Sequence, residues 1–143
     1  MRSFVNTGAA YIRKADPTRK VSVGGGCPLD AEHCGRYLGL NVDFYDFHVY
    51  RTDGYLPPVS SLGLDKPVLI GEFSVSVEDC QDDQKLKQGV ETFLRNAERG
   101  GYMGALYWCY GYPGSKSPRM QLLKGHGSSE WRPAAHVFGN FRR

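Results

Sequence analysis

The sequence has no long apolar run, no strong net charge and few cysteines. Nowhere in its 143 residues does an apolar stretch approach about 18 residues, the length expected of a membrane-spanning helix. The net charge is only +3, and the basic residues are scattered apart from the final Arg142-Arg143, so we expect neither a membrane nor a nucleic-acid partner. Residues 1–14 lack the apolar core of a signal peptide, and the localisation stays undetermined.

The four cysteines, at positions 27, 34, 80 and 109, match no zinc-binding spacing. His33 lies between Cys27 and Cys34, but no second Cys-His pair follows, so we expect no metal site. Small buried thiols are the simplest interpretation, with a Cys27–Cys34 disulfide in a loop as the alternative. The run Gly24–Gly26 lacks the spacing of a dinucleotide-binding loop, and we expect no cofactor.

The composition is that of one ordinary globular domain, 1–143. Hydrophobic residues make up 41% of the chain and charged residues 23%, which argues against disorder. A chain of 143 residues is long enough for a single core. Aromatic residues reach 13%, a share that suits either a sugar-stacking cleft or an aromatic core.

Apolar patterning predicts strands that alternate with mainly helical connections. Such alternation indicates βαβ units and an α/β fold with a parallel sheet. The expected strands are 20–24, 42–50, 68–73 and 104–110; the expected helices are 5–15, 29–38, 82–99 and 131–141; a turn of helix is expected at 59–62 and a long polar loop at 112–129.

The segment Lys66–Phe73 carries a carboxylate at the end of an apolar run. Its apolar, β-branched residues after a proline are typical of a buried parallel strand. Glu72 then lies at the carboxyl edge of the sheet, where α/β barrels keep their chemistry. Because a desolvated carboxylate is costly unless it is hydrogen-bonded or used, we interpret Glu72 as a candidate catalytic residue.

Two other strand ends carry side chains that suit a sugar substrate. His48 and Tyr50 are two residues apart and therefore share a face, and Trp108 lies near the end of the last strand. A tyrosine hydroxyl can orient a carboxylate, an imidazole can bind a substrate hydroxyl, and an indole can stack on a sugar ring. Each also has a plainer interpretation, as a core histidine, a rim tyrosine or a core tryptophan.

In order and spacing, these segments resemble the C-terminal half of a clan A glycoside hydrolase, closest to the cellulases and mannanases of family 5. Residues 16–24 look like that family's entry to strand five. The other matching segments are Phe47–Tyr50 (the strand-six His-x-Tyr), Gly71–Phe73 (the strand-seven nucleophile), Leu106–Trp108 (the strand-eight Trp) and Trp131–Ala135 (the closing helix).

This resemblance implies a (β/α)8 TIM barrel, of which the chain would form strands five to eight, a half barrel. It also implies retaining hydrolysis of β-glycosidic bonds in an oligo- or polysaccharide. Glu72 would be the nucleophile, Tyr50 would hydrogen-bond it, and His48 and Trp108 would hold the sugar.

The second carboxylate of such a site is missing. The family's general acid/base is a Glu that follows an Asn at the end of strand four, and this sequence contains no Asn-Glu pair. Retaining hydrolysis needs two carboxylates about 5–5.5 Å apart. The spare acids are Asp43, Asp46 and Glu32; Asp46 shares the face of His48, one layer deeper, and a hydrogen-bonding role is expected for it.

Two functions therefore stay open: the nucleophile-bearing half of an enzyme, or a truncated half barrel that binds carbohydrate or only self-associates. Half a barrel leaves its first and last strands as open edges. We expect its inner face to expose residues such as Val68, Ile70 and Leu106. Either a homodimer or a missing N-terminal half would cover these surfaces.

Overall fold

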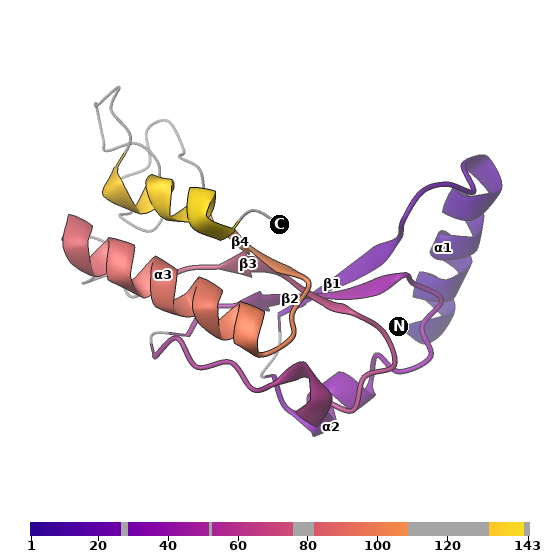
Figure 1. The fold of residues 1–143 in the computed structure, drawn as a ribbon. Coiled ribbons are helices and arrows are strands. Elements are labelled where there is room, and N and C mark those ends of the chain that lie inside the picture. Colours follow the sequence, from indigo (N-terminus) through magenta and orange to yellow (C-terminus); the bar gives the residue numbers. More distant parts are fainter. Residues whose placement is uncertain (27–28, 52, 76–81, 109–131, 142–143) are drawn as a thin grey trace.

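Four parallel strands form one sheet in this computed structural model, which describes residues 1–143 except 27–28, 52, 76–81, 109–131 and 142–143. The spatial order follows the chain: β1 (Ser22–Gly26), β2 (Phe44–Val49), β3 (Val68–Phe73) and β4 (Gly104–Tyr107) (Figure 1). The predicted strand 68–73 is confirmed residue for residue. The strand predicted at 20–24 lies two residues later, and those predicted at 42–50 and 104–110 are shorter in the described residues.

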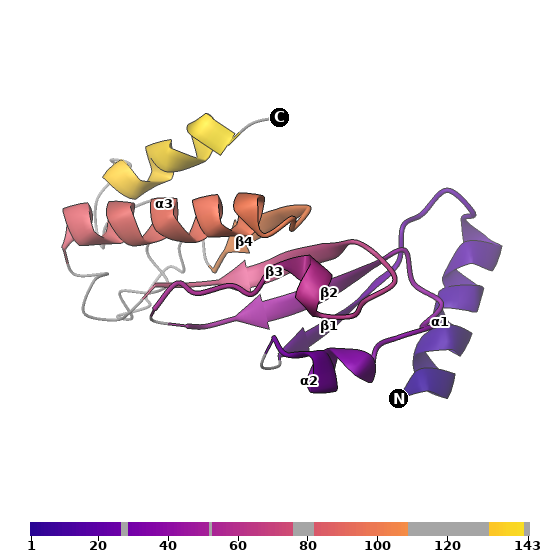
Figure 2. The ribbon, with the colours of Figure 1, turned by 60° about the horizontal axis from the view of Figure 1, so that its bottom comes forward.

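The helices are α1 (Arg2–Ala15), α2 (Ala31–Gly35) and α3 (Asp83–Arg99), with 3-10 segments η1 (Val59–Ser61) and η4 (Pro133–Phe141). The prediction for α3 is confirmed, and the Asp82 carboxylate caps it by accepting from the backbone N–H groups of Gln84 and Lys85. Figures 1 and 2 show α3 and η4 side by side. Within the described residues, no helix has both the length and the apolar character needed to cross a membrane.

The core lies on one face of the sheet. In β2, Tyr45, Phe47 and Val49 are buried, whereas the alternating residues are only half-buried. From α3, Phe93 stacks on Phe73 of β3 with ring centroids 4.0 Å apart and an interplanar angle of 1°. We call the opposite side of the sheet, which carries the half-buried residues, the inner face.

The prediction that Val68 and Ile70 belong to the inner face is wrong. Both side chains are fully buried in the core on the helix-covered side. Leu106 does belong to the inner face, because its neighbour Ala105 pairs with Ile70 and strand residues alternate. Leu106 is 56% exposed, so the described part of the inner face is less apolar than expected but does carry an exposed leucine.

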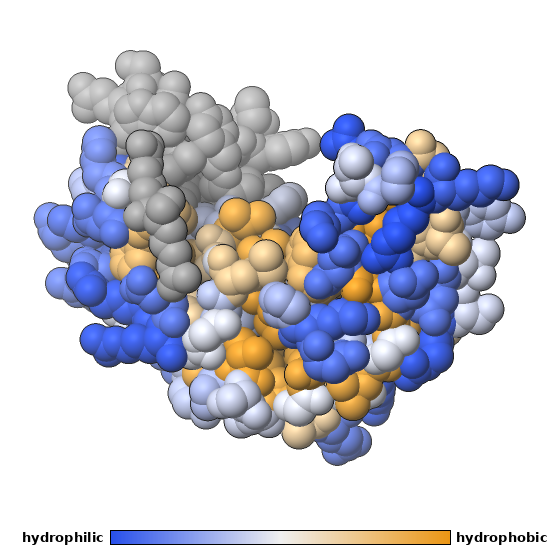
Figure 3. Space-filling view, turned by 45° about the vertical axis from the view of Figure 1, so that its right-hand side comes forward, coloured by the Kyte–Doolittle hydropathy of each residue, from blue (hydrophilic) through white to orange (hydrophobic). Residues whose placement is uncertain are grey.

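Apolar surface is also uncovered at the ends of the sheet. In the described residues β1 and β4 each pair with a single strand, so the two open edges predicted for a half barrel are present. On α1, Ala9 is buried, but Phe4 is 85% exposed and Ile12 47%. Figure 3 shows hydrophobic residues gathered across the middle of one face of the molecule, between hydrophilic margins.

Asp43 connects the beginning of the chain to the start of β2. Its Oδ2 accepts from the Val21 backbone N–H at 2.8 Å and from Arg13 Nη2 at 2.9 Å, and Lys20 Nζ lies 3.3 Å from Oδ1. The Val21 N–H, followed by Arg13, lowers the pKa of Asp43 to about 2. Asp43 lies at the opposite end of β2 from the carboxyl edge, so it is a structural group and no spare acid for the site.

The stacked pair of Phe73 and Phe93 predicts a large effect of truncation. Phe93→Ala should lower the free energy of unfolding by about 3–5 kcal/mol, because it removes a buried ring and leaves a cavity. Urea denaturation of the purified chain measures this loss. Phe4→Ala, at an exposed ring, is the matched control and should change stability by less than about 0.5 kcal/mol. Equal losses in the two variants would contradict this description of the core.

The lowered pKa of Asp43 predicts an acid-dependent contribution to stability. The folded pKa of about 2 lies below the ordinary aspartate value, so the ionised carboxylate stabilises the fold above about pH 4. That contribution should be lost as the pH falls from about 4 toward 2. The urea midpoints of wild type and Asp43→Asn should therefore converge on acidification, whereas Glu32→Gln should follow wild type throughout. A gap that stays constant with pH would argue against this role of Asp43.

Candidate functional site

A β-bulge at Gly71 determines which way Glu72 points. The pairing of β2 with β3 is regular up to Ile70, but His48 then pairs with Glu72 and Gly71 has no residue opposite. In a regular strand, Glu72 would share the buried face of Ile70. The extra residue shifts the alternation by one, so Glu72 reaches the inner face and Phe73 enters the core.

Three of the four predicted site residues meet around one carboxylate oxygen. The Tyr50 hydroxyl donates a hydrogen bond to Glu72 Oε2, and His48 Nδ1 lies 3.3 Å from the same oxygen. Side-chain exposure is 25% for Glu72 and 32% for His48, so the group is sheltered but reachable from the inner face. The hydrogen bond from Tyr50 fixes the orientation of the Glu72 carboxylate.

Trp108 lies one strand away from this group. Its backbone N–H donates to the Phe73 carbonyl at 2.8 Å, which extends the pairing of β3 and β4 beyond Tyr107. The alternation of β4 gives Trp108 the same face as Leu106, which is the inner face. Trp108 is 42% exposed, so a flat apolar side chain is available one strand away from Glu72.

Asp46 lies below His48 on the same face of β2. Its Oδ1 is 3.9 Å from His48 Nε2, so the imidazole lies between two carboxylates. The third spare acid, Glu32, is on α2 and is 84% exposed, with Arg36 Nη2 3.9 Å away. Among the described residues, no group of three or more His, Cys, Asp or Glu side chains is placed to hold a metal ion. Cys34 is buried, as expected of a small buried thiol, and Cys27 lies outside the described residues, so the alternative of a Cys27–Cys34 disulfide is untested.

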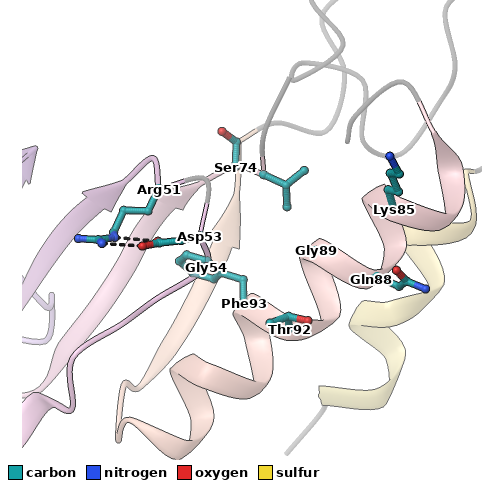
Figure 4. Close-up of a pocket in the computed structure, with 10 residues that line it drawn as sticks. Arg51, Asp53, Gly54, Ser74, Lys85, Gln88, Gly89, Thr92 and Phe93 are labelled. Atoms are coloured by element: carbon teal, nitrogen blue, oxygen red, sulfur yellow. Dashed lines mark hydrogen bonds and ion pairs between the residues drawn. The ribbon is translucent and has the colours of Figure 1, made fainter. Parts of the chain in front are cut away.

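A separate polar pocket of about 360 Å³ lies between the loop after β2 and α3. Arg51 and Asp53 pair on one side of it, with Arg51 Nη2 2.7 Å from Asp53 Oδ2 (Figure 4). Ser74, just after β3, is buried with its hydroxyl unpartnered in the described residues. In Figure 4 the polar ends of Ser74, Lys85 and Gln88 point in different directions. These three polar groups of the described lining therefore do not converge on one point.

No family model matches the sequence, and no curated protein matches it. Solved structures do match. An endo-1,4-beta-mannanase from Eisenia fetida is 28% identical with a TM-score of 0.55, over 81% of this chain and 36% of its own. A beta-1,4-mannanase from the sea hare Aplysia kurodai is 26% identical with a TM-score of 0.54, over 91% of this chain and 42% of its own.

A third match shows the likeness of fold alone. A monomeric beta-xylosidase from Caulobacter crescentus is 17% identical, with a TM-score of 0.58, and is matched over 99% of this chain and 37% of its own. The chain therefore spans less than half the length of each of these proteins. It has the fold of half a glycoside hydrolase barrel.

The comparisons confirm the predicted resemblance and the half-barrel fold, and the roles of individual residues stay predictions. The sequence did not lead us to predict the register change at Gly71 or the position of Asp46 beside it.

A glycine inside an otherwise β-branched strand is a sequence signal for a bulge. That signal was present directly before Glu72.

Proposed function

We propose that this half barrel is the nucleophile-bearing part of a retaining glycoside hydrolase that cleaves β-glycosidic bonds in a polysaccharide. The observation that carries the proposal is the Glu72 carboxylate on the inner face at the carboxyl edge, with Tyr50 and His48 on the same oxygen. Two of the similar solved structures are β-1,4-mannanases, which makes a β-mannan the first substrate to test.

The two carboxylate oxygens of Glu72 have different surroundings, and we propose different roles for them. Oε2 accepts a hydrogen bond from Tyr50 and lies 3.3 Å from His48 Nδ1, whereas Oε1 has no hydrogen-bond partner among the described residues. In the proposed first step Oε1 attacks the anomeric carbon, the new C–O bond forms, and the glycosidic C–O bond breaks. The bonding electrons go to the leaving oxygen, which takes a proton from an acid. Water then cleaves the glycosyl-enzyme ester, while Trp108 offers its ring face to the sugar.

We propose that the acid comes from a part of the barrel that this chain does not form, because no second carboxylate of the described residues faces Glu72 from the inner face. On the described inner face, the carboxylates near His48 are Glu72 itself and Asp46, whose Oδ1 is buried. Asp46 therefore lies below the imidazole and does not face a leaving group above the rim. We propose that a completing half carries the second carboxylate.

A non-identical half fits this chain better than a second copy does. In a (β/α)8 barrel each strand is followed by one helix. This chain has a helix before β1 and another helical segment after β4. In a barrel made of two copies, β4 of one copy would lie next to β1 of the other, with room for one helix between them. Both η4 of the first copy and α1 of the second would have to occupy that one position. The completing half should begin and end with a strand, so we favour an N-terminal half over a homodimer.

The second candidate function is a half barrel that binds carbohydrate without cleaving it. Among the described residues no second carboxylate faces Glu72, and the aromatic residues Trp108 and Tyr50 are 42% and 45% exposed; both observations favour this alternative. Covalent labelling of Glu72 separates the two candidates.

A 2,4-dinitrophenyl 2-deoxy-2-fluoro-β-mannoside should form a covalent adduct with Glu72. Dinitrophenolate leaves without protonation, so the first step needs the nucleophile but no general acid, and the fluorine slows the second step. Intact mass and peptide mapping measure the adduct. Glu72→Gln should give none, and Glu32→Gln should label like wild type. A wild-type chain without label on Glu72 would favour the non-catalytic alternative.

The chain alone should hydrolyse β-mannan or β-glucan oligosaccharides weakly or not at all. Loss of proton donation typically lowers the rate by about 10²–10⁴-fold. Fusing the N-terminal half of the Eisenia fetida mannanase ahead of Met1 should raise the rate, and Glu72→Gln in that fusion should abolish it. Fast hydrolysis by the chain alone that depends on Glu72 would show that a second carboxylate is already present.

A further inference from the structure

We propose that Asp46 is a positioning residue of this site: its carboxylate occupies the space that Gly71 leaves open and fixes the His48 imidazole so that Nδ1 faces Glu72. The inference rests on the proposed function, because it assigns a role within the same site. It concerns a residue that does not touch the reacting carboxylate itself.

The His48 ring has one nitrogen facing each carboxylate. Nδ1 lies 3.3 Å from Glu72 Oε2, and Nε2 lies 3.9 Å from Asp46 Oδ1. A half-turn about the Cβ–Cγ bond would replace both nitrogens by carbon atoms, which neither donate nor accept comparable hydrogen bonds. The two carboxylates therefore select the same ring orientation. The 3.9 Å separation from Asp46 is longer than a direct hydrogen bond.

Two glycines frame this arrangement. A Cβ atom at Gly71 would overlap Asp46 Oδ1 and lie 2.7 Å from Oδ2, so the carboxylate is seated where a side chain of β3 would otherwise be. On the other side, a Cβ atom at Gly24 would lie at an ordinary contact distance, 3.6 Å from His48 Nε2 and 4.0 Å from Cε1. The bulge that turns Glu72 to the inner face thus also makes the place for Asp46.

The burial of Asp46 gives a second reason for a role. Oδ1 is buried and has no hydrogen-bond partner in the described residues. A buried, unpartnered carboxylate oxygen destabilises a fold, so an acid that only filled this space would be a poor choice. His48 Nε2 is the polar atom that faces it. The alternative is that the completing half supplies a hydrogen-bond donor to Asp46 Oδ1. In that case a substitution of Asp46 would leave the His48 ring of this chain unchanged.

The test is a nuclear Overhauser measurement on the full chain, which needs no catalysis. The approach of Gly24 to Cε1 predicts a cross-peak between His48 Hε1 and a Gly24 Hα proton. A half-turn of the ring exchanges Cε1 with Nε2 and so moves Hε1 closer to Gly24. Asp46→Leu should therefore strengthen this cross-peak, whereas Asp46→Asn, which keeps an oxygen acceptor, should leave its intensity unchanged. Gly71→Ala should have the same effect as Asp46→Leu, because the added methyl group would occupy the space of the Asp46 carboxylate. Gly26→Ala, which adds a methyl group in open space, is the matched control and should leave it unchanged.

The rate of labelling of Glu72 by the fluoromannoside is the second readout. At saturating reagent, Asp46→Leu should slow labelling about tenfold to a hundredfold, as expected when a catalytic group is misplaced by about 1 Å. The half-saturating concentration should stay within about twofold, and Asp46→Asn should recover most of the rate.

The outcomes separate this inference from the proposed function. A cross-peak of unchanged intensity in folded Asp46→Leu overturns the role of Asp46, whatever the labelling shows. If the wild type is unlabelled but Asp46→Leu still strengthens the cross-peak, the proposed nucleophile is overturned and the positioning role is supported. An equal change in Asp46→Asn and Asp46→Leu, with the fold intact by circular dichroism, would also overturn the role of Asp46, because the acceptor would then not matter.

Discussion

The bulge at Gly71 is the constraint on which the rest of the site depends. Without the extra residue, Glu72 would follow Ile70 into the core, and the fold would have to bury a carboxylate among aromatic rings. With it, Phe73 takes the core position against Phe93 and Glu72 reaches Tyr50 and His48. One backbone irregularity thus satisfies the packing of the sheet and the chemistry of its inner face together.

The same sheet shows that the described residues form half a barrel. Its helix-covered side is a closed core, but in the described part of the chain β1 and β4 each pair with one strand only, and Leu106 on the inner face and Phe4 on α1 are exposed. The similar solved structures extend well beyond the matched region. Completion of the barrel would cover these surfaces and, in our proposal, bring the missing acid to face Glu72.

Much of this fold could be predicted from sequence, and the reasons differ from element to element. The strand 68–73 and α3 were recognisable because a continuous apolar run and a 3.6-residue stripe are strong local signals. The wrong placement of Val68 and Ile70 came from assigning faces without the sheet register, which depends on contacts between strands. Asp43 was counted among the acids of the site, because sequence does not reveal that Arg13 and the Val21 N–H bind it. The contact between Asp46 and Gly71 depends on how the bulge sets the register of β2 against β3, so the sequence alone did not predict it either.

The register of β2 against β3 tests the central claim most directly. Cross-strand nuclear Overhauser contacts in the isotope-labelled chain report which residues lie opposite one another. We expect contacts that pair Phe47 with Ile70 and His48 with Glu72, and no residue of β2 opposite Gly71. Contacts that pair His48 with Gly71 and Val49 with Glu72 would contradict the account, because Glu72 would then share the buried face of Ile70.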